Sequence, residues 1–230
     1  MSTAPAPLVV AIDGPAGAGK STVARRLAKV LGIPFVDTGA MYRAAALHLS
    51  SRGIDLDDRA AVAGGLASLP LELALEQGAA TVLLAGQSVD ERIRSAEVGA
   101  MTSRLAVHAE LRAFMVARQR KFVERHGGVM EGRDIGTVVV PKARCKFFLD
   151  AASSTRAVRR HAELQARGQA ADFEVLQQQI VERDDRDRSR GSSPLAVAAD
   201  AIVIHTDGLS VDGVVERLRV EVEKRRGSVG

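Results

Sequence analysis

Residues 8–21 read LVVAIDGPAGAGKS, an apolar run that leads into a glycine-rich turn. The last eight of these residues fit the pattern G-x-x-x-x-G-K-[ST]. Glycines let the backbone wrap closely around oxygen atoms, so that successive N–H groups point inward at an anion. The apolar run has the length of a strand, and residues 20–31 have a helical pattern, which places the positive end of a helix dipole at the loop. This stretch therefore predicts a binding site for a nucleoside triphosphate.

The loop pattern also predicts roles for individual residues. Lys20 can reach the β- and γ-phosphates, and the Ser21 hydroxyl can bind Mg²⁺. We therefore expect the loop and the start of its helix to bind ATP together with Mg²⁺. The residues in this set are Gly14, Pro15, Ala16, Gly17, Ala18, Gly19, Lys20, Ser21 and Thr22.

Beyond the loop, short apolar runs alternate with helical patterns, which predicts an α/β fold with a five-stranded parallel sheet flanked by helices. Residues 71–89 differ, because turn signals at Gln77-Gly78 and Gly86-Gln87 separate short apolar runs and predict a small antiparallel insert. The expected parallel strands are 8–12, 35–37, 129–131, 146–149 and 201–204. The expected helices are 20–31, 38–52, 57–68, 95–107, 110–125, 155–167, 173–187 and 211–226.

Composition restricts the class of protein. The chain has 46% hydrophobic residues and no apolar stretch long enough to span a membrane, and its first residues lack the basic region of a secretion signal. Cys145 is the only cysteine, so we expect no internal disulfide and no cysteine-based zinc cluster. These features lead us to expect a cytoplasmic protein without a membrane partner. We also expect a monomer, although composition does not decide this.

A net charge of +4 invites a nucleic-acid interpretation. However, the chain has no Trp and a single Tyr for base stacking, and its arginines are mixed with acids in residues 182–188. A basic balance can equally serve a highly anionic small substrate, so we expect no nucleic-acid partner.

Three classes of triphosphate-binding protein are compatible with the loop. A guanine-nucleotide switch would need an N-K-x-D signature, and the chain contains no asparagine. A motor would be longer and would carry an apolar run ending in an acid, for which residues 129–131 (VME) are only a weak candidate. A small-molecule kinase needs an acceptor site rich in cations, and arginines occur in at least three segments. If the acceptor is a phosphate oxygen, it is already ionised, so no general base is needed and the five histidines are expected at the surface.

Three further motifs carry a resemblance to a known family: DTGAMYR at 37–43, EGRDIGT at 131–137 and ERDDRDR at 182–188. Together with the loop, they make the chain from Leu8 to Val222 similar to the bacterial cytidylate kinases. The resemblance implies a single P-loop kinase unit, with a core of residues 8–37, 128–152 and 190–226. It also implies a monophosphate-binding region at 38–127 that contains the antiparallel insert, and a helical lid with its following helix at 153–189.

The activity implied by the resemblance is transfer of the γ-phosphoryl group of ATP to CMP or dCMP. Thr38, Tyr42 and Arg43 would form the monophosphate pocket, and Ser103, Arg112 and Asp134 would recognise cytosine. The remaining implied contacts are Arg133 at the acceptor phosphate, Arg183 and Asp187 at the sugar, Arg190 near the phosphates and Arg159 in the lid over ATP. Catalysis would rest on Lys20, Arg133, Arg159 and Arg190, and we expect Asp37 to support the Mg²⁺ bound by Ser21.

Helical spacing places Arg183, Asp187 and Arg190 on one face, which agrees with a shared site. The same spacing predicts that Asp184 and Arg188 form a solvated ion pair. The alternatives left open are a related kinase acting on UMP or AMP and, more distantly, a P-loop regulatory or nucleic-acid module.

Overall fold

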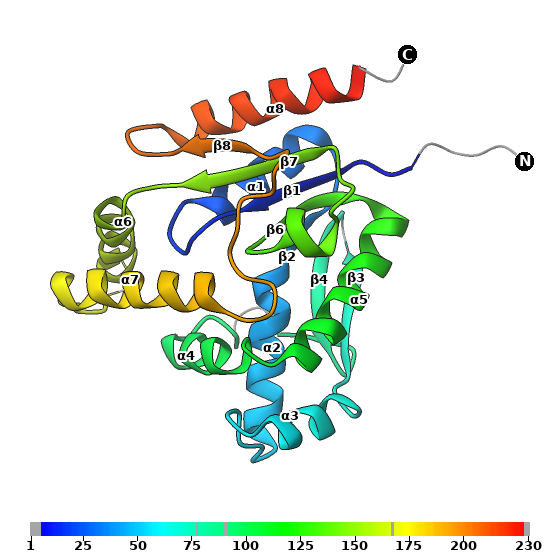
Figure 1. Ribbon diagram of the computed structural model, residues 1–230, viewed down its shortest axis with the longest axis vertical. Helices are drawn as coiled ribbons and strands as arrows, with labels where there is room; N and C mark the ends of the chain where they lie inside the picture. Colours follow the sequence, from blue (N-terminus) through cyan, green and yellow to red (C-terminus); the bar gives the residue numbers. More distant parts are fainter. Residues whose placement is uncertain (1–5, 77, 90–91, 167, 228–230) are drawn as a thin grey trace, which may run out of the picture. The chain divides into compact units, whose positions relative to one another are not determined.

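The computed structural model describes residues 6–76, 78–89, 92–166 and 168–227, and Figure 1 shows its ribbon. Its larger sheet has five strands in the order β2-β6-β1-β7-β8. The strands are β1 (Val9–Asp13), β2 (Phe35–Asp37), β6 (Gly128–Gly132), β7 (Cys145–Asp150) and β8 (Ile202–His205). Strand β7 pairs in parallel with both β1 and β8. The predicted α/β fold with five parallel strands is therefore confirmed.

The chain forms two compact units, and the first consists of Met1–Val9 and Gly32–Met130. Its helices are α2 (Thr38–Ser51), α3 (Arg59–Leu66), α4 (Ala96–Leu105) and α5 (Ala109–His126). Helix α2 is central, since it packs against α4, α5 and the insert strands. The buried face of α2 is built of alanines, Met41 and Leu49, which lets neighbouring helices approach it closely.

The first unit also contains the predicted antiparallel insert. Strands β3 (Leu71–Glu76), β4 (Ala79–Leu84) and β5 (Gln87–Ser88) form a three-stranded sheet in that order. In the β3–β4 pair, Leu71 lies opposite Leu84, and this inward pair joins the core of the unit. Ala85 and Gly86 both have positive φ at the β4–β5 turn, which confirms the second turn signal. Of the first turn signal, Gln77 lies outside the described residues.

The second unit consists of Val10–Leu31 and Glu131–Gly230. Helices α1 (Lys20–Leu31) and α8 (Val211–Gly227) pack against each other, and α8 also contacts β7. Helices α6 (Ser153–Ala166) and α7 (Phe173–Ser189) form a separate pair around a small apolar cluster of Ala157, Leu176 and Ile180. In Figure 1 this pair lies beyond the end of β7.

Short polar side chains decide where several helices begin. Asp37, Asp58, Ser95 and Asp172 each accept a hydrogen bond from a backbone N–H in the first turn of α2, α3, α4 and α7 respectively. Such caps satisfy donors that a helix cannot satisfy itself. Because Asp58 takes the cap position, α3 begins at Arg59 rather than at residue 57, where the helix is expected to begin from the sequence.

The segment after β6 has a structure that the sequence patterns do not predict. It forms one turn of π-helix, η1 (Ile135–Val139). The buried Asp13 carboxylate accepts hydrogen bonds from the N–H groups of Ile135 and Gly136, at 2.8 and 2.7 Å. A residue 122 positions away thus fixes the start of this turn, and local sequence patterns carry no signal for such a contact.

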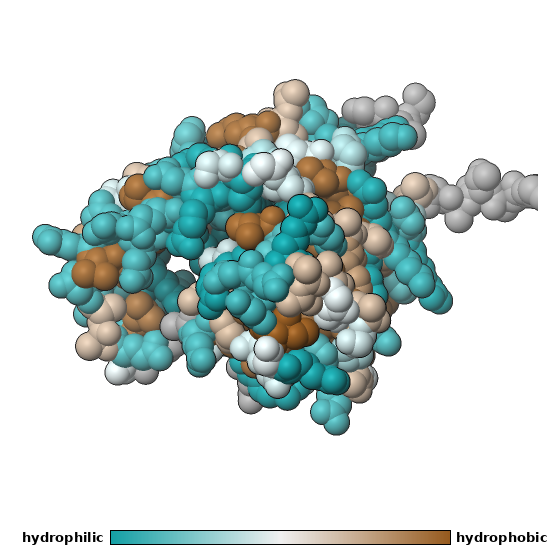
Figure 2. Space-filling model, turned by 60° about the horizontal axis from the view of Figure 1, so that its bottom comes forward, coloured by the Kyte–Doolittle hydropathy of each residue, from teal (hydrophilic) through white to brown (hydrophobic). Residues whose placement is uncertain are grey.

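The face drawn in Figure 2 is mostly hydrophilic, with small and scattered hydrophobic areas. Scattered apolar groups of this kind are normal for a folded surface. Within the described residues, no helix combines the length and the apolar character needed to cross a membrane.

Candidate active site

The glycine-rich loop joins β1 to α1 and has the predicted strand–loop–helix context. Gly14, Gly17 and Gly19 all have positive φ, at 146°, 80° and 85°. A side chain at Gly14 would have no room, because its Cβ would lie 2.0 Å from the backbone oxygen of Leu149 on β7. The loop backbone is therefore shaped by positions that only glycine fills without strain.

Lys20 lies at the first position of α1 and is only 5% exposed. Its Nζ donates a hydrogen bond to the backbone oxygen of Pro15 at 2.6 Å, so the ammonium group lies within the loop itself. Burial, and after it the charge of the Arg133 guanidinium, lower the pKa of Lys20 to about 7, although the charges of Glu131 and Asp13 act in the opposite direction. A lysine with such a lowered pKa takes up a proton when an anion binds beside it, because the anion favours the charged form of the amine.

Ser21 follows Lys20 in α1 and contacts an acidic side chain of strand β6. Its Oγ donates a hydrogen bond to Oε2 of Glu131 at 2.8 Å, and Glu131 is 4% exposed near the end of β6. A hydroxyl beside a carboxylate offers the oxygen ligands that Mg²⁺ prefers. Sequence reasoning assigned Glu131 no role at the loop, although an acid at the end of an apolar strand was the available signal.

No three His, Cys, Asp or Glu side chains are grouped as a metal cage in the part of the chain that the structure describes. Asp37, the carboxylate expected to support Mg²⁺, belongs to the first unit. There it accepts hydrogen bonds from the Ala40 N–H at 2.9 Å and from Nη2 of Arg43 at 2.8 Å.

Asp13 connects the phosphate loop to the segment that carries Arg133 and Asp134. It is the last residue of β1, and its two bonds to η1 fix the backbone directly after Asp134. Burial raises the pKa of Asp13 to about 6, although the two N–H donors pull it down. The carboxylate at the start of the loop thus positions the segment that carries the predicted acceptor residues.

Three of the predicted substrate residues form a compact cluster in the second unit. Nε of Arg133 donates to Oδ2 of Asp187 at 2.8 Å, and Nη1 of Arg190 lies 3.7 Å from Oδ1 of the same carboxylate. Burial alone would raise the pKa of Asp187, but Arg133 and Arg190 outweigh it and hold that pKa below its usual range. The cluster therefore keeps an ionised acid between two guanidinium groups, and the charges of Arg133 and Arg183 also act on Lys20.

Arg159, the expected lid arginine, lies beside the carboxyl end of β8. Its guanidinium donates to the Thr206 hydroxyl at 3.1 Å and to the Thr206 backbone oxygen at 2.8 Å. Its Nη1 is also 4.0 Å from the point that a Cβ on Gly19 would occupy. Arg159 is thus next to the last turn of the phosphate loop.

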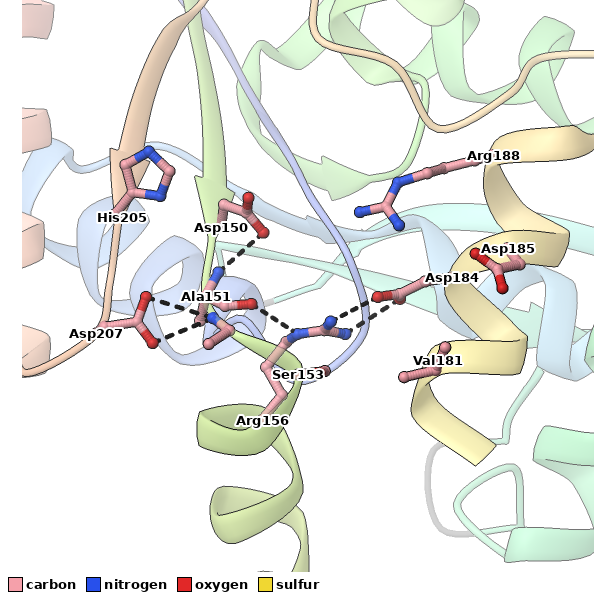
Figure 3. A pocket seen from close by; sticks show the side chains of 11 residues that line it. Asp150, Ala151, Ser153, Arg156, Val181, Asp184, Asp185, Arg188, His205 and Asp207 are labelled. Carbon is pink, nitrogen blue, oxygen red and sulfur yellow. Dashed lines mark hydrogen bonds and ion pairs between the residues drawn. The ribbon is translucent and has the colours of Figure 1, made fainter. Parts of the chain in front are cut away.

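The prediction of a solvated pair between Asp184 and Arg188 is wrong for Asp184. This carboxylate is 3% exposed and forms a bidentate ion pair with Arg156 of α6. Figure 3 shows this pair at the edge of a polar cavity of about 470 Å³, where the ends of β7 and β8 meet α6 and α7. The cause of the error is tertiary packing, which turns this part of α7 toward α6.

The first unit contains the other predicted substrate residues. Arg43 forms an ion pair with Asp37, and its Nη1 lies 3.1 Å from the point that a Cβ on Gly39 would occupy. Arg112 is 3% exposed, with its guanidinium carbon 5.6 Å from the centre of the Tyr42 ring, a distance typical of a cation–π contact. Helix α2 thereby places Tyr42 and Arg43 in the same turn of one helix.

Thr38 and Ser103 complete the predicted set in this unit. Thr38 opens α2 and is 4% exposed. Ser103 lies in α4, where its hydroxyl donates to the backbone oxygen of Gly99 at 3.3 Å. The structure thus brings Tyr42 together with Arg112, and Arg43 with Asp37, while Ser103 bonds within its own helix.

Comparisons with known proteins agree with these features. A family model described as "Cytidylate kinase" matches residues 10–224. A protein of Nitratidesulfovibrio vulgaris named "Cytidylate kinase" is 46% identical over 95% of this chain and 94% of its own. Proteins with the same name from Exiguobacterium sibiricum and Rhodococcus jostii are 46% and 42% identical, over 91% and 96% of this chain and 94% and 97% of their own.

Proposed function

Because this chain belongs to the cytidylate kinase family, we propose that it transfers the γ-phosphoryl group of ATP to CMP and dCMP, giving ADP and CDP or dCDP. The observation that carries the proposal is the phosphate loop, in which a buried Lys20 is influenced by the charge of Arg133 from the predicted acceptor segment. Such an arrangement suits a reaction in which one cation serves a triphosphate and another serves a second phosphate.

The chain's own residues supply binding, alignment and charge. The attacking oxygen belongs to a phosphate and is ionised near neutral pH, so none of the side chains needs to remove a proton. Lys20 exchanges its bond to the Pro15 oxygen for phosphate oxygens, and Arg133 and Arg190 bind the acceptor phosphate or stabilise the transferred charge. Arginine suits this role because its rigid fork binds phosphate through two hydrogen bonds.

Two residues of the second unit fit Mg²⁺ bound with ATP, namely Ser21 and Glu131. Their hydroxyl and carboxylate oxygens are hydrogen-bonded to each other at 2.8 Å and match the ligand preference of this ion. Bound Mg²⁺ would neutralise charge on the transferring phosphates. Asp37 stays a second candidate for supporting the ion.

We assign acceptor binding in the first unit to residues of α2, α4 and α5. Thr38, Tyr42 and Arg43 would bind the monophosphate, and Ser103 and Arg112 would read the base together with Asp134. Residues 38–127 form the proposed monophosphate-binding region, and residues 153–189 form the proposed lid and the helix that follows it. Arg183 and Asp187 would contact the sugar, and Arg159 would close over ATP. We propose that the enzyme acts as a monomer in the cytoplasm.

A coupled assay of ADP release across CMP, dCMP, UMP and AMP tests the proposed acceptor. We expect CMP and dCMP to give the highest kcat/KM, and a preference for UMP or AMP would contradict the assignment. Lys20→Ala should lose at least a hundredfold in kcat, since it removes charge stabilisation at the transferred group. Lys29→Ala is the matched control, because Lys29 is exposed at the far end of the same helix.

The Mg²⁺ assignment is tested by titrating the metal with ATP held saturating. Ser21→Ala and Glu131→Gln should each raise the Mg²⁺ concentration at half-maximal rate, because each removes a proposed oxygen ligand. Asp37→Asn provides the comparison between the two candidate carboxylates. A larger shift for Asp37→Asn than for Glu131→Gln would transfer the role to Asp37.

A further inference from the structure

Arg156 makes an unusual set of contacts for a residue of a predicted lid helix. It lies in the first turn of α6 and is 3% exposed. Its Nε donates to the backbone oxygen of Ala151 at 2.9 Å, and its Nη1 donates to the backbone oxygen of Ala16 at 3.1 Å. Both terminal nitrogens also bond to the Asp184 carboxylate, at 3.1 and 2.5 Å (Figure 3). One guanidinium group thus contacts the phosphate loop, the end of β7 and helix α7.

The contact with the phosphate loop sets the position of its turn. Ala16 and Gly17 lie at the middle of the loop, and a Cβ on Gly17 would come within 3.1 Å of the Arg156 Cβ. The side chain therefore lies directly against the loop backbone while its guanidinium bonds to the Ala16 oxygen. When the N–H groups of a loop point inward at an anion, its carbonyl groups point outward and can accept hydrogen bonds from neighbouring side chains.

The contact with α7 fixes a helix that carries proposed substrate residues. Asp184 directly follows Arg183 and precedes Asp187 by three residues in the same helix. Because a helix moves as a stiff unit, fixing Asp184 also fixes the positions of Arg183 and Asp187. Asp187 in turn bonds to Arg133, so the constraint extends to the acceptor segment.

A contribution to stability does not by itself explain the buried ion pair between Arg156 and Asp184. Burying two charges is costly, and apolar residues of similar size often stabilise a protein as well or better. The same α6–α7 interface does use apolar packing nearby, through Ala157, Leu176 and Ile180. Packing therefore does not explain why a charged pair is present here. The additional hydrogen bond from Arg156 to the Ala16 oxygen suggests that the pair positions the phosphate loop.

We propose that Arg156 is a positioning residue that holds the phosphate loop in fixed register with helix α7, so that triphosphate and acceptor are aligned for transfer. The inference rests on the proposed function and adds to it a residue that acts through Ala16 and Asp184 rather than on a substrate. Misalignment of reacting groups by about 1 Å can cost on the order of a hundredfold in rate. Loss of the link should therefore appear in kcat more than in either KM.

The main variant is the double substitution Arg156→Met with Asp184→Leu in the full chain. It replaces the buried pair by apolar groups and so keeps the α6–α7 interface packed, but removes the bond to Ala16. We expect a Tm within a few degrees of wild type, kcat at least tenfold lower, and KM values for ATP and CMP within about threefold. Wild-type kcat in this folded variant would overturn the proposal.

Two single variants keep the proposal testable if the double variant does not fold. Arg156→Lys retains the charge but cannot make all four bonds, so kcat should lie between the wild type and the double variant. Asp184→Asn should lower kcat at least tenfold, whereas Asp185→Asn, the same change one position along on the exposed side of α7, is the matched control. Equal kcat for the two asparagine variants, or wild-type kcat for Arg156→Lys, would overturn the proposal.

All rates are expressed relative to the wild type on the monophosphate that the wild type uses best. If the proposed acceptor is wrong, the wild-type assay across the monophosphates shows it. If the proposed role of Arg156 is wrong, the kcat of each variant equals that of the wild type.

Discussion

Binding of a triphosphate should draw a proton onto Lys20. Burial and the neighbouring Arg133 lower the pKa of Lys20 to about 7 in the free protein. A triphosphate beside the amine would favour its charged form and raise that pKa well above the pH of the experiment. At pH 8 about nine tenths of the free amines would be neutral, so binding should take up about 0.9 proton per site, and about 0.5 at pH 7.

Isothermal titration calorimetry measures this uptake directly. The nucleotide is ATP itself, which is not turned over without Mg²⁺ and an acceptor, titrated in two buffers that differ in ionisation enthalpy. The slope of observed enthalpy against buffer enthalpy gives the number of protons taken up. At pH 8 the phosphates contribute little, because their last pKa lies near 6.

Two variants separate Lys20 from other titrating groups. Lys20→Met has no group to titrate and should take up close to no protons at pH 8, although it binds more weakly. Lys29→Met, an exposed position on the same helix, should behave as the wild type. Wild-type uptake below about 0.3 proton at pH 8, or equal uptake in Lys20→Met, would refute the reasoning.

Three further predictions concern stability and charge. The pKa of Asp13 is raised from 3.8 to about 6, so between these pH values the native state binds a proton that the unfolded state does not. The free energy of unfolding of the wild type, measured relative to Asp13→Asn, should therefore fall by on the order of 3 kcal/mol between pH 4 and pH 7. A relative stability that is flat or rises in urea titrations would contradict this. Gly14→Ala should lose about 3 kcal/mol or more, against about 1–2 kcal/mol for Gly53→Ala, because both have positive φ but only the first meets backbone atoms. Equal losses would exclude the clash. Arg133→Met should raise the pKa of Asp187, since Arg133 is the largest charge holding it down; an unchanged carboxyl titration by NMR would exclude that pairing.

The sequence predicts most of the secondary structure of this fold because its signals are local. The loop pattern with its flanking apolar run predicts β1 and α1, and α1 spans Lys20–Leu31 as expected. Short apolar runs that are buried on both faces predict the parallel strands, and β2 spans Phe35–Asp37 as expected. Element ends differ by one or two residues where a cap decides them, as Asp58 does for α3.

Side-chain contacts between segments far apart in the chain could not be predicted from local sequence patterns. An acid at the end of an apolar strand is a signal that Glu131 can serve the loop, but it does not specify Ser21 as the partner, and nothing near Asp184 indicates that its partner is Arg156. Helical spacing alone placed Asp184 beside Arg188 in solvent, because it specifies which residues share a face but not which face is covered. The resemblance supplied the list of substrate residues, and their proposed roles still depend on the experiments above.

The Lys20 amine is hydrogen-bonded to the backbone of the loop that it is proposed to serve. Its Nζ donates to the Pro15 oxygen at 2.6 Å, so a phosphate oxygen that accepts from this amine has to replace an internal hydrogen bond. A triphosphate can offer oxygens to the loop N–H groups as well as to the amine, and these contacts offset the loss of the bond to Pro15. The cost of breaking that bond is the same for every anion, so tight binding requires a ligand that makes several further contacts with the loop.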